Sequence, residues 1–377
     1  MRVGIAQVNS VVGDIQRNTQ AVIDLAHEAA RRGADVLVTG ELVLLGYPPR
    51  DLLLRDGVLD ACRAGLDRLA ADTAGLDLTI IVGYPRQVDD AGTGRRARNA
   101  AAVVHRGQVL EVYDKQLLPG YDVFDEDRYF EPGASSCCIT VAGRRVGVLI
   151  CEDLWEAADV DLAGRYDRSP LAALRDASPE VILALNASPF VVGKWARHVD
   201  LLGDLASTHE VDIVAVNQVG ANDDLIFDGR SMVVRANGVL QAVAPGWDAG
   251  LTMVDLAEPA PTAALHAAPD PLEETFAALS LGIRDYVAKT GHEQVLLGLS
   301  GGIDSALCAT LAAHALGPAS VQGVVMPSRF SSTESSEDAM ELSRRLGLPP
   351  AIHAPIGSAH LAMQMALSSA RQLETGG

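Results

Sequence analysis

The sequence lacks the features of a secreted or membrane-bound protein. No apolar run approaches the roughly 20 residues that a membrane-spanning helix needs. The first residues, MRVGIAQV, lead directly into an apolar strand pattern without the regions of a signal peptide. The five cysteines form no CxxC pair and are odd in number, which does not indicate a disulfide framework. We therefore expect a soluble cytoplasmic protein with reduced thiols.

Excess positive charge is missing as well. The chain carries 30 Lys and Arg against 49 Asp and Glu, which gives a formal net charge of −19. Nucleic acids and anionic membrane surfaces select basic protein faces, so we expect neither as a partner. The nine histidines show no HExxH spacing, and no GKS or GKT of a Walker loop occurs. The sequence therefore gives no reason to expect a prosthetic group.

Residues 1–255 alternate short apolar runs with segments of helical periodicity. A strand at 3–8 precedes a helix that begins after Asp14 and ends at Gly33. Asn237-Gly238 predicts a hairpin within 231–244, and Arg106-Gly107 predicts another. Further strands are predicted at 35–41, 78–84, 100–105, 108–115, 145–151, 180–186 and 211–217. Many strands are apolar at consecutive positions, which predicts an α/β fold with sheets covered on both faces.

The pattern changes after residue 257. Residues 258–271 contain four prolines and no periodicity, which predicts a linker between a domain at 1–257 and a second domain at 272–377. The second domain is predicted to contain a strand ending at Gly298, a glycine turn and a helix. A strand at 321–327 and helices at 272–290, 333–346 and 358–373 complete the predicted elements.

Three reactive side chains lie at or just beyond strand ends in the first domain: Glu41, Lys115 and Cys151. Catalytic groups in α/β proteins gather at the carboxyl ends of strands, so we expect the three to converge. Two acids follow Cys151 and disfavour its thiolate. Glu41 would take the thiol proton, and the Lys115 ammonium would favour the thiolate and stabilise an oxyanion. Taken singly, each of these residues is more often structural, and Cys151 could equally be an inert core thiol.

Three segments resemble, in order, the Glu-Lys-Cys motifs of the nitrilase, or carbon–nitrogen hydrolase, superfamily: GELVLLGYPPRDLL, YDKQLLPGYDVFDEDRYFEPG and GVLICEDLW. The resemblance covers residues 1 to about 255. It implies a nitrilase-like four-layer α-β-β-α sandwich that hydrolyses an amide through a cysteine thioester. The stretches KQLLPGYDVFDEDRYF and NASPFVVGK are similar to the glutaminase domain of the glutamine-dependent NAD⁺ synthetase family. That likeness implies glutamine as substrate, bound by Tyr121, Glu152, Ser188 and Lys194.

A second motif, SGGIDS, follows a strand in the second domain. The turn brings together backbone N–H groups, hydroxyls and a helix N-terminus, which suit a phosphate, although an ordinary strand-to-helix turn is the plainer interpretation. The motif resembles the pyrophosphate-binding loop of the N-type ATP pyrophosphatases. The likeness implies a Rossmann-like parallel sheet of the adenine nucleotide α-hydrolase type and ATP as substrate. Asp304 is a candidate Mg²⁺ ligand. The ATP-binding residues would be Gly298, Leu299, Ser300, Gly301, Gly302, Ile303, Asp304 and Ser305.

The segment MPSRFSS, residues 326–332, resembles the loop after the next strand in NAD⁺ synthetases. On that likeness Ser328 and Arg329 lie near the nucleotide. The alternative is a solvated serine-rich loop, and the sequence gives the two interpretations equal weight.

Both motifs in one chain imply a glutamine-dependent amidotransferase of the NAD⁺ synthetase family. Its reaction would pass ammonia from glutamine, through a shielded passage, to deamido-NAD⁺ adenylated by ATP. The products would be NAD⁺, AMP, pyrophosphate and glutamate, and the likeness implies a homo-oligomer. Only about 80 residues follow Gly298, whereas the family's synthetase domain continues further. We therefore expect a C-terminally truncated chain whose incomplete second domain is inactive in synthesis.

Two other classes of function remain open. One is a stand-alone amidase of the same superfamily with a remnant nucleotide-binding tail, and the other is a non-catalytic binding or regulatory chain. The remaining conspicuous features are interpreted as structural. Cys137-Cys138 begins a strand, Cys308 lies in the core, and the acidic run 122–127 forms a solvated loop near the glutamine site.

Overall fold

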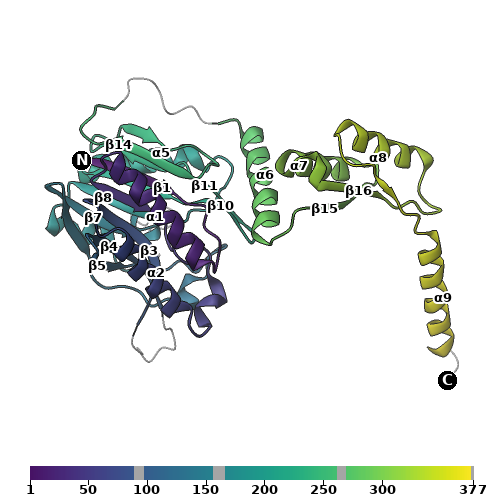
Figure 1. The fold of residues 1–377 in the computed structure, drawn as a ribbon, viewed down its shortest axis with the longest axis horizontal. Helices are drawn as coiled ribbons and strands as arrows, with labels where there is room; N and C mark the ends of the chain where they lie inside the picture. Colours follow the sequence, from purple (N-terminus) through teal and green to yellow (C-terminus); the bar gives the residue numbers. More distant parts are fainter. Residues whose placement is uncertain (89–96, 156–165, 261–268, 375–377) are drawn as a thin grey trace. The chain divides into compact units, whose positions relative to one another are not determined.

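The structure, a computed structural model, describes residues 1–88, 97–155, 166–260 and 269–374 (Figure 1). The chain divides into two compact units, Met1–Ala278 and Leu279–Gly377. Residues 261–268 of the predicted linker lie outside the described residues, so the linker and the domain boundaries around it stay predictions. None of the helices in the described part combines the length and apolarity that a membrane span needs.

Two six-stranded mixed sheets form the centre of the first unit. The first sheet has the order β14-β1-β2-β3-β4-β5 and the second β13-β12-β9-β8-β7-β6. The first comprises β1 (Arg2–Gln7), β2 (Val36–Thr39), β3 (Thr79–Gln87), β4 (Ala97–His105), β5 (Gln108–Asp114) and β14 (Gly250–Asp255). The second comprises β6 (Cys137–Val141), β7 (Arg144–Ile150), β8 (Val181–Asn186), β9 (Asp212–Asn217), β12 (Met232–Val234) and β13 (Leu240–Val243).

Successive side chains along the strands of the first sheet point to opposite faces and pack in two separate hydrophobic cores. Val36 and Val38 of β2 pack in one core with residues of the second sheet, and Leu37 packs in another core with the helices. Helices α1 (Ile15–Arg31) and α2 (Val58–Asp72) cover the first sheet, and α3 (Glu152–Trp155), α4 (Pro170–Ala173) and α5 (Lys194–His209) pack on the second. The predicted four-layer α-β-β-α sandwich is therefore confirmed.

Local turn chemistry explains several predicted elements. Asp14 caps α1 by accepting a hydrogen bond from the Arg17 N–H at 3.1 Å, and Gly33 follows the helix at φ +73°. The Asn237-Gly238 turn joins antiparallel β12 and β13, with Gly238 at φ +79°. Arg106 and Gly107, both at positive φ, turn β4 into β5. Both predicted hairpins are confirmed. The shorter elements are β10 (Val219–Asn222), β11 (Leu225–Asp228), η1 (Arg50–Leu54), η2 (Glu126–Arg128) and η3 (Arg175–Ala177).

The second unit contains a parallel sheet of order β15-β16-β17, as predicted. Helix α6 (Pro271–Lys289) contains the boundary between the two units. The elements that follow it are β15 (Val295–Gly298), α7 (Ile303–Leu316), η4 (Pro318–Ser320), β16 (Val321–Val325), α8 (Thr333–Arg345), β17 (Ile352–His353) and α9 (Gly357–Glu374). The expectation that Cys308 lies in the core is wrong. Ala309, Ala312 and Ala313 are the buried residues of this part of α7, and Cys308 is exposed.

Candidate active site

The three candidate catalytic residues lie just beyond the ends of β2 and β5 in the first sheet and of β7 in the second sheet, and they meet in the interior of the first unit. Glu41 lies two residues after β2, Lys115 directly after β5, and Cys151 directly after β7. Glu41 and Lys115 are fully buried, and Cys151 is 6% exposed. The Lys115 Nζ lies 2.7 Å from the Glu41 Oε1. The structure thus brings together the residues that the strand-end argument selected.

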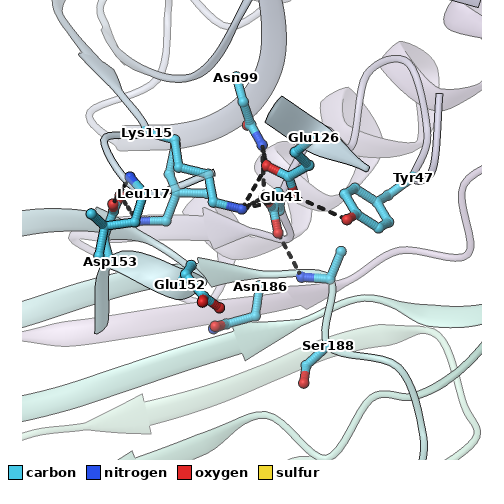
Figure 2. Close-up of polar contacts among 12 residues, drawn as sticks. Glu41, Tyr47, Asn99, Lys115, Leu117, Glu126, Glu152, Asp153, Asn186 and Ser188 are labelled. Carbon is cyan, nitrogen blue, oxygen red and sulfur yellow. Dashed lines mark hydrogen bonds and ion pairs between the residues drawn. The ribbon is translucent and has the colours of Figure 1, made fainter. Parts of the chain in front are cut away.

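A fourth residue, Glu126, belongs to this cluster and was not predicted. Both of its carboxylate oxygens lie within 2.9 Å of the Lys115 Nζ, and the Tyr47 hydroxyl donates to Oε1 at 2.9 Å (Figure 2). Glu126 is 4% exposed, so the interpretation of 122–127 as a solvated acidic loop is wrong at this position. The run turns inward through η2, and a buried ammonium needs more than one acceptor. No signal in the local sequence separates Glu126 from the other acids of this run, since Asp125 and Asp127 flank it directly.

Fixed partners hold the Glu41 carboxylate in place. Oε1 accepts from the Asn99 Nδ2 at 2.7 Å, and Oε2 accepts from the Ala187 N–H at 3.1 Å. The segment around Glu41 also passes close to Gly83 of β3, where an added Cβ would lie 2.5 Å from the Gly40 oxygen and the Leu42 nitrogen. Position 83 therefore requires glycine, because any side chain would displace this segment.

Cys151 lies on a sharp turn between β7 and α3. Its φ of +45° is in the left-handed region that non-glycine residues rarely adopt. The Cys151 N–H donates to the Leu185 oxygen at 2.9 Å, and its own carbonyl accepts from the Leu154 N–H at 2.9 Å. Strained backbone of this kind occurs at functional sites, where the surrounding structure has to stabilise it.

The charges of the cluster act on the thiol. Burial raises the pKa of Cys151 well above its usual value, Glu41 raises it further, and Lys115 opposes them. Lys115 thus favours the thiolate, as expected, but burial and Glu41 outweigh its effect, and the resting residue is a neutral thiol. Burial also raises the pKa of Glu126 to about 7 against the opposing effect of Lys115. For Lys115, burial alone would lower the pKa, but Glu126 and Glu41 raise it well above its usual value.

The four predicted glutamine-binding residues form two pairs at this site. The Tyr121 hydroxyl donates to the Glu152 carboxylate at 3.0 Å, and the Lys194 Nζ donates to the Ser188 Oγ at 2.6 Å. Glu152 also accepts from Tyr166 at 2.7 Å. Ser188 and Lys194 line a cavity of about 30 Å³ together with Trp155 and Asn186, among other residues. Asn186 and Ser188 flank Ala187, whose N–H binds Glu41, so the cavity adjoins the catalytic cluster (Figure 2).

In the second unit, the predicted ATP-binding residues 298–305 run from the end of β15 through a compact turn at 299–302 into the first turn of α7. The Ser300 Oγ accepts from the Gly302 N–H at 3.3 Å and lies 3.0 Å from the Ser305 Oγ. Gly301, at φ +78°, lies so close to α8 that an added Cβ would overlap the Ser335 carbonyl oxygen. A hollow of about 450 Å³ borders the turn, lined by Gly298, Leu299, Ser300, Val325, Met326, Pro327, Phe330, Ser331, Ser332, Ser335 and Ser336.

Asp304, Ser328 and Arg329 are the other residues of this unit that the sequence placed near a nucleotide. Asp304 is exposed on the first turn of α7. Among the described residues no three His, Cys, Asp or Glu side chains are grouped to hold a metal ion, so Asp304 would contribute a single carboxylate. The Ser328 Oγ accepts from the Phe330 N–H at 3.2 Å, and the Arg329 guanidinium lies 4.7 Å from the Phe330 ring centroid.

Comparison with known proteins identifies relatives of both units. The carbon-nitrogen hydrolase family model matches residues 2–260, and the NAD synthase family model matches residues 275–376. A glutamine-dependent NAD(+) synthetase of Synechocystis is 39% identical over 354 residues, which covers 92% of this chain and 63% of the relative. One of Thermotoga maritima is 38% identical, with 92% and 64% covered. The chain thus spans a little over three fifths of the length of these relatives.

Solved structures agree with these matches. A glutamine-dependent NAD+ synthetase from Acinetobacter baumannii, in complex with adenosine diphosphate, is 36% identical with a TM-score of 0.84, covering 97% of this chain and 66% of that one. An amidase from Nesterenkonia is 25% identical with a TM-score of 0.57, covering 68% of this chain and 90% of that one. The resemblance to both families is confirmed, and the chain belongs to the carbon-nitrogen hydrolase family.

Proposed function

We propose that the first unit hydrolyses the side-chain amide of glutamine and that the chain has the function of a glutamine-dependent NAD⁺ synthetase. One observation carries the glutaminase proposal. A fully buried Lys115–Glu41 pair, 2.7 Å apart, acts on a buried thiol at a strained turn. A purely structural role would not account for this ion pair. Apolar side chains could fill the same space without the free-energy cost of removing two charges from water.

The residues divide the chemistry as follows. Glu41 accepts the proton of the Cys151 thiol while the sulfur attacks the amide carbon, and the negative charge forms on the amide oxygen. The Lys115 ammonium, which carries its proton at neutral pH, stabilises that oxyanion. Glu41 then transfers the proton to the leaving nitrogen, and ammonia departs from a Cys151 thioester. Water activated by Glu41 hydrolyses the thioester to glutamate and restores the thiol.

Tyr121, Glu152, Ser188 and Lys194 would bind the amino-acid end of glutamine. The Glu152 carboxylate supplies negative charge for the α-ammonium group, and Lys194 supplies positive charge for the α-carboxylate. Tyr121 and Ser188 orient these two groups through the hydrogen bonds at 3.0 and 2.6 Å.

The second unit would bind ATP at residues 298–305. The turn offers main-chain N–H groups, the hydroxyls of Ser300 and Ser305, and the N-terminus of α7 to phosphate oxygens. Mg²⁺ would bind the phosphates with Asp304 as a single protein ligand, since this ion retains several water and phosphate ligands. The complex of the Acinetobacter relative with adenosine diphosphate supports nucleotide binding as such. Adenylation of deamido-NAD⁺, the ammonia passage, the homo-oligomer and the cytoplasmic location remain part of the proposal.

Glutamate release by the 377-residue chain tests the glutaminase proposal directly. We expect glutamine-dependent release that disappears in Cys151→Ala and falls about 100-fold or more in Lys115→Met, because each variant removes one part of the acyl-transfer site. Release that persists in Cys151→Ala would disprove the assignment of the nucleophile.

A stand-alone amidase is the second candidate, favoured by the similarity of the first unit to the Nesterenkonia amidase. A panel of glutamine, asparagine, acetamide and propionamide separates the two. Preference for glutamine, lost in Lys194→Met through a raised KM, supports the glutaminase. Faster hydrolysis of the simple amides, with no effect of Lys194→Met, supports the amidase.

A further inference from the structure

Asp153, the second acid after Cys151, is fully buried and accepts four hydrogen bonds. Its Oδ1 accepts from the N–H groups of Leu117 at 2.8 Å and Gln116 at 3.1 Å. Its Oδ2 accepts from the Tyr113 hydroxyl at 2.9 Å and the Ile150 N–H at 3.3 Å. These four donors belong to two segments, one on each side of the active site.

The two segments carry the catalytic lysine and the nucleophile. Gln116 and Leu117 directly follow Lys115, and Ile150 directly precedes Cys151. In Figure 2, Asp153 and Leu117 lie at the main-chain end of Lys115, whereas Glu41 and Glu126 lie at its ammonium end. The carboxylate thus joins the end of β5 in the first sheet to the end of β7 in the second sheet.

The chemistry of the four donors requires a carboxylate at this position. Three of them are main-chain N–H groups, which can only donate, and both oxygens of Asp153 receive at least one of them. An amide would point its NH₂ group at a main-chain N–H in either orientation. Burial penalises the charge and raises the pKa of Asp153 to about 7, whereas Lys115 and the donated hydrogen bonds lower it.

We propose that Asp153 is a positioning residue for the hydrolysis: it sets the distance between the Lys115 ammonium and the Cys151 thiol by binding the backbone of both segments. The inference takes its substrate, glutamine, from the proposed function, whereas the contacts of Asp153 stand without that function. Asp153 touches none of the reacting groups in this scheme. Its effect passes through the main chain of residues 116–117 and 150, so it acts on the chemical step and not on the binding of glutamine.

The variant Asp153→Asn, which is nearly isosteric, tests this role in the full chain. We expect kcat for glutamate release to fall about 100-fold with KM within threefold, because misplacement of about 1 Å costs this much in a preorganised site. Alkylation of Cys151 by iodoacetamide, followed by peptide mass spectrometry, should slow at least tenfold. Unchanged kcat, or a raised KM with unchanged kcat, would overturn the proposal.

Asp212→Asn is the matched control. Asp212 is another buried aspartate of this unit, accepts from the Ala236 N–H at 3.0 Å and pairs with Arg144 at 3.1 Å, but it has no contact with the site. It should lower the melting temperature while kcat and the alkylation rate stay unchanged. If Asp153→Asn does not fold, Tyr113→Phe decides: removal of this one hydrogen bond should lower kcat severalfold at constant KM, and constant kcat would contradict the role.

The alkylation rate separates this inference from the proposed function. A parent chain that releases no glutamate would contradict the glutaminase proposal. The comparison of Cys151 alkylation in the parent and in Asp153→Asn would still support or overturn the positioning role, because iodoacetamide needs no glutamine site.

Discussion

Cys151 is held as a neutral thiol, because burial and the charge of Glu41 outweigh the effect of Lys115 on its pKa. A thiol in this state needs a base in contact with the substrate complex, unlike a cysteine whose surroundings generate a stable thiolate. The two acids that follow it have separate contacts, and neither takes part in that proton transfer in the proposed scheme. Glu152 faces the tyrosine hydroxyls of the proposed glutamine site, and Asp153 binds the backbone.

Lys115 is buried with the carboxylates of Glu41 and Glu126, so we expect substitutions at Lys115 and Glu126 to have non-additive effects on the free energy of unfolding. Lys115→Met leaves Glu41 and Glu126 unpaired in the interior and should lower the free energy of unfolding by about 3–5 kcal/mol. Adding Glu126→Gln to that variant removes one of the two charges, so the double variant should be more stable than Lys115→Met by at least about 1 kcal/mol. Urea unfolding followed by tryptophan fluorescence measures this, since all three tryptophans lie in the first unit. Additive effects would contradict the coupling.

We expect His198 to contribute to the loss of stability of the first unit at acidic pH. Burial lowers its pKa from 6.5 to about 3, with further lowering by Lys194 and Arg197, and its ring stacks on Trp155 at 4.4 Å. Below pH 6.5 the unfolded chain binds a proton that the folded chain does not, so stability is lost as the pH falls. His198→Phe keeps the stacked ring and removes the titration.

The difference between parent and His198→Phe isolates this contribution. From pH 6.5 to 5 the free energy of unfolding of the parent should fall relative to the variant by up to about 1.4 kcal/mol per pH unit. The two should run parallel above pH 7. Parallel curves over the whole range would show that His198 titrates equally in the folded and unfolded chains, which would contradict the prediction.

At the level of elements, β3 sets the position of Glu41 through Gly83. An added Cβ would lie 2.5 Å from two backbone atoms of the Glu41 segment. Gly83→Ala should therefore destabilise the first unit by about 1–3 kcal/mol and lower kcat for glutamate release more than tenfold. Gly75→Ala is the control, because nothing lies within 4 Å of its added Cβ, and it should change neither quantity. A Gly83→Ala variant with parental kcat would show that this approach does not position Glu41.

The elements differ in how far the sequence predicted them. Strands with consecutive apolar residues, the capped helix α1 and the two turns at Arg106-Gly107 and Asn237-Gly238 carry local signals and were predicted. Helices α2 and α5 and the edge strand β14 were not. The buried residues of the two helices recur at helical spacing, so both carried a periodic signal that the prediction did not use: Leu59, Cys62, Leu66, Leu69 and Ala70 in α2, and Trp195, Val199, Leu202, Leu205 and Ala206 in α5. β14 has mostly half-buried residues and pairs only with β1.

In the candidate site, residues at strand ends were predictable and residues reached through loops were not. Glu41, Lys115 and Cys151 lie at or just beyond strand ends, where catalytic groups of α/β proteins gather, so the strand pattern selected them. Glu126 arrives through η2 within an acidic run, and nothing in the local sequence distinguishes it from its exposed neighbour Asp127. The roles of all these residues in catalysis remain predictions that the variants above test.

For the whole molecule, the two units have cores of very different size. Among the residues that the structure describes, the first unit packs three large clusters of buried residues, whereas the second has two clusters of four buried residues each. We expect the second unit to open at lower free energy, since stability rises with buried apolar area. In hydrogen exchange followed by mass spectrometry, amides of β15 and β16 should exchange well before those of β8. Equal protection of the two units would contradict this expectation.

The central claim is that Cys151 forms a thioester with the side chain of glutamine. Acid quenching of the chain during turnover, followed by intact-mass and peptide mass spectrometry, tests it most directly. The account predicts a mass increase of one glutamyl group on the peptide that contains Cys151, and its absence in Cys151→Ala. Glutamate release without any such adduct on Cys151, or an adduct on another residue, would contradict it.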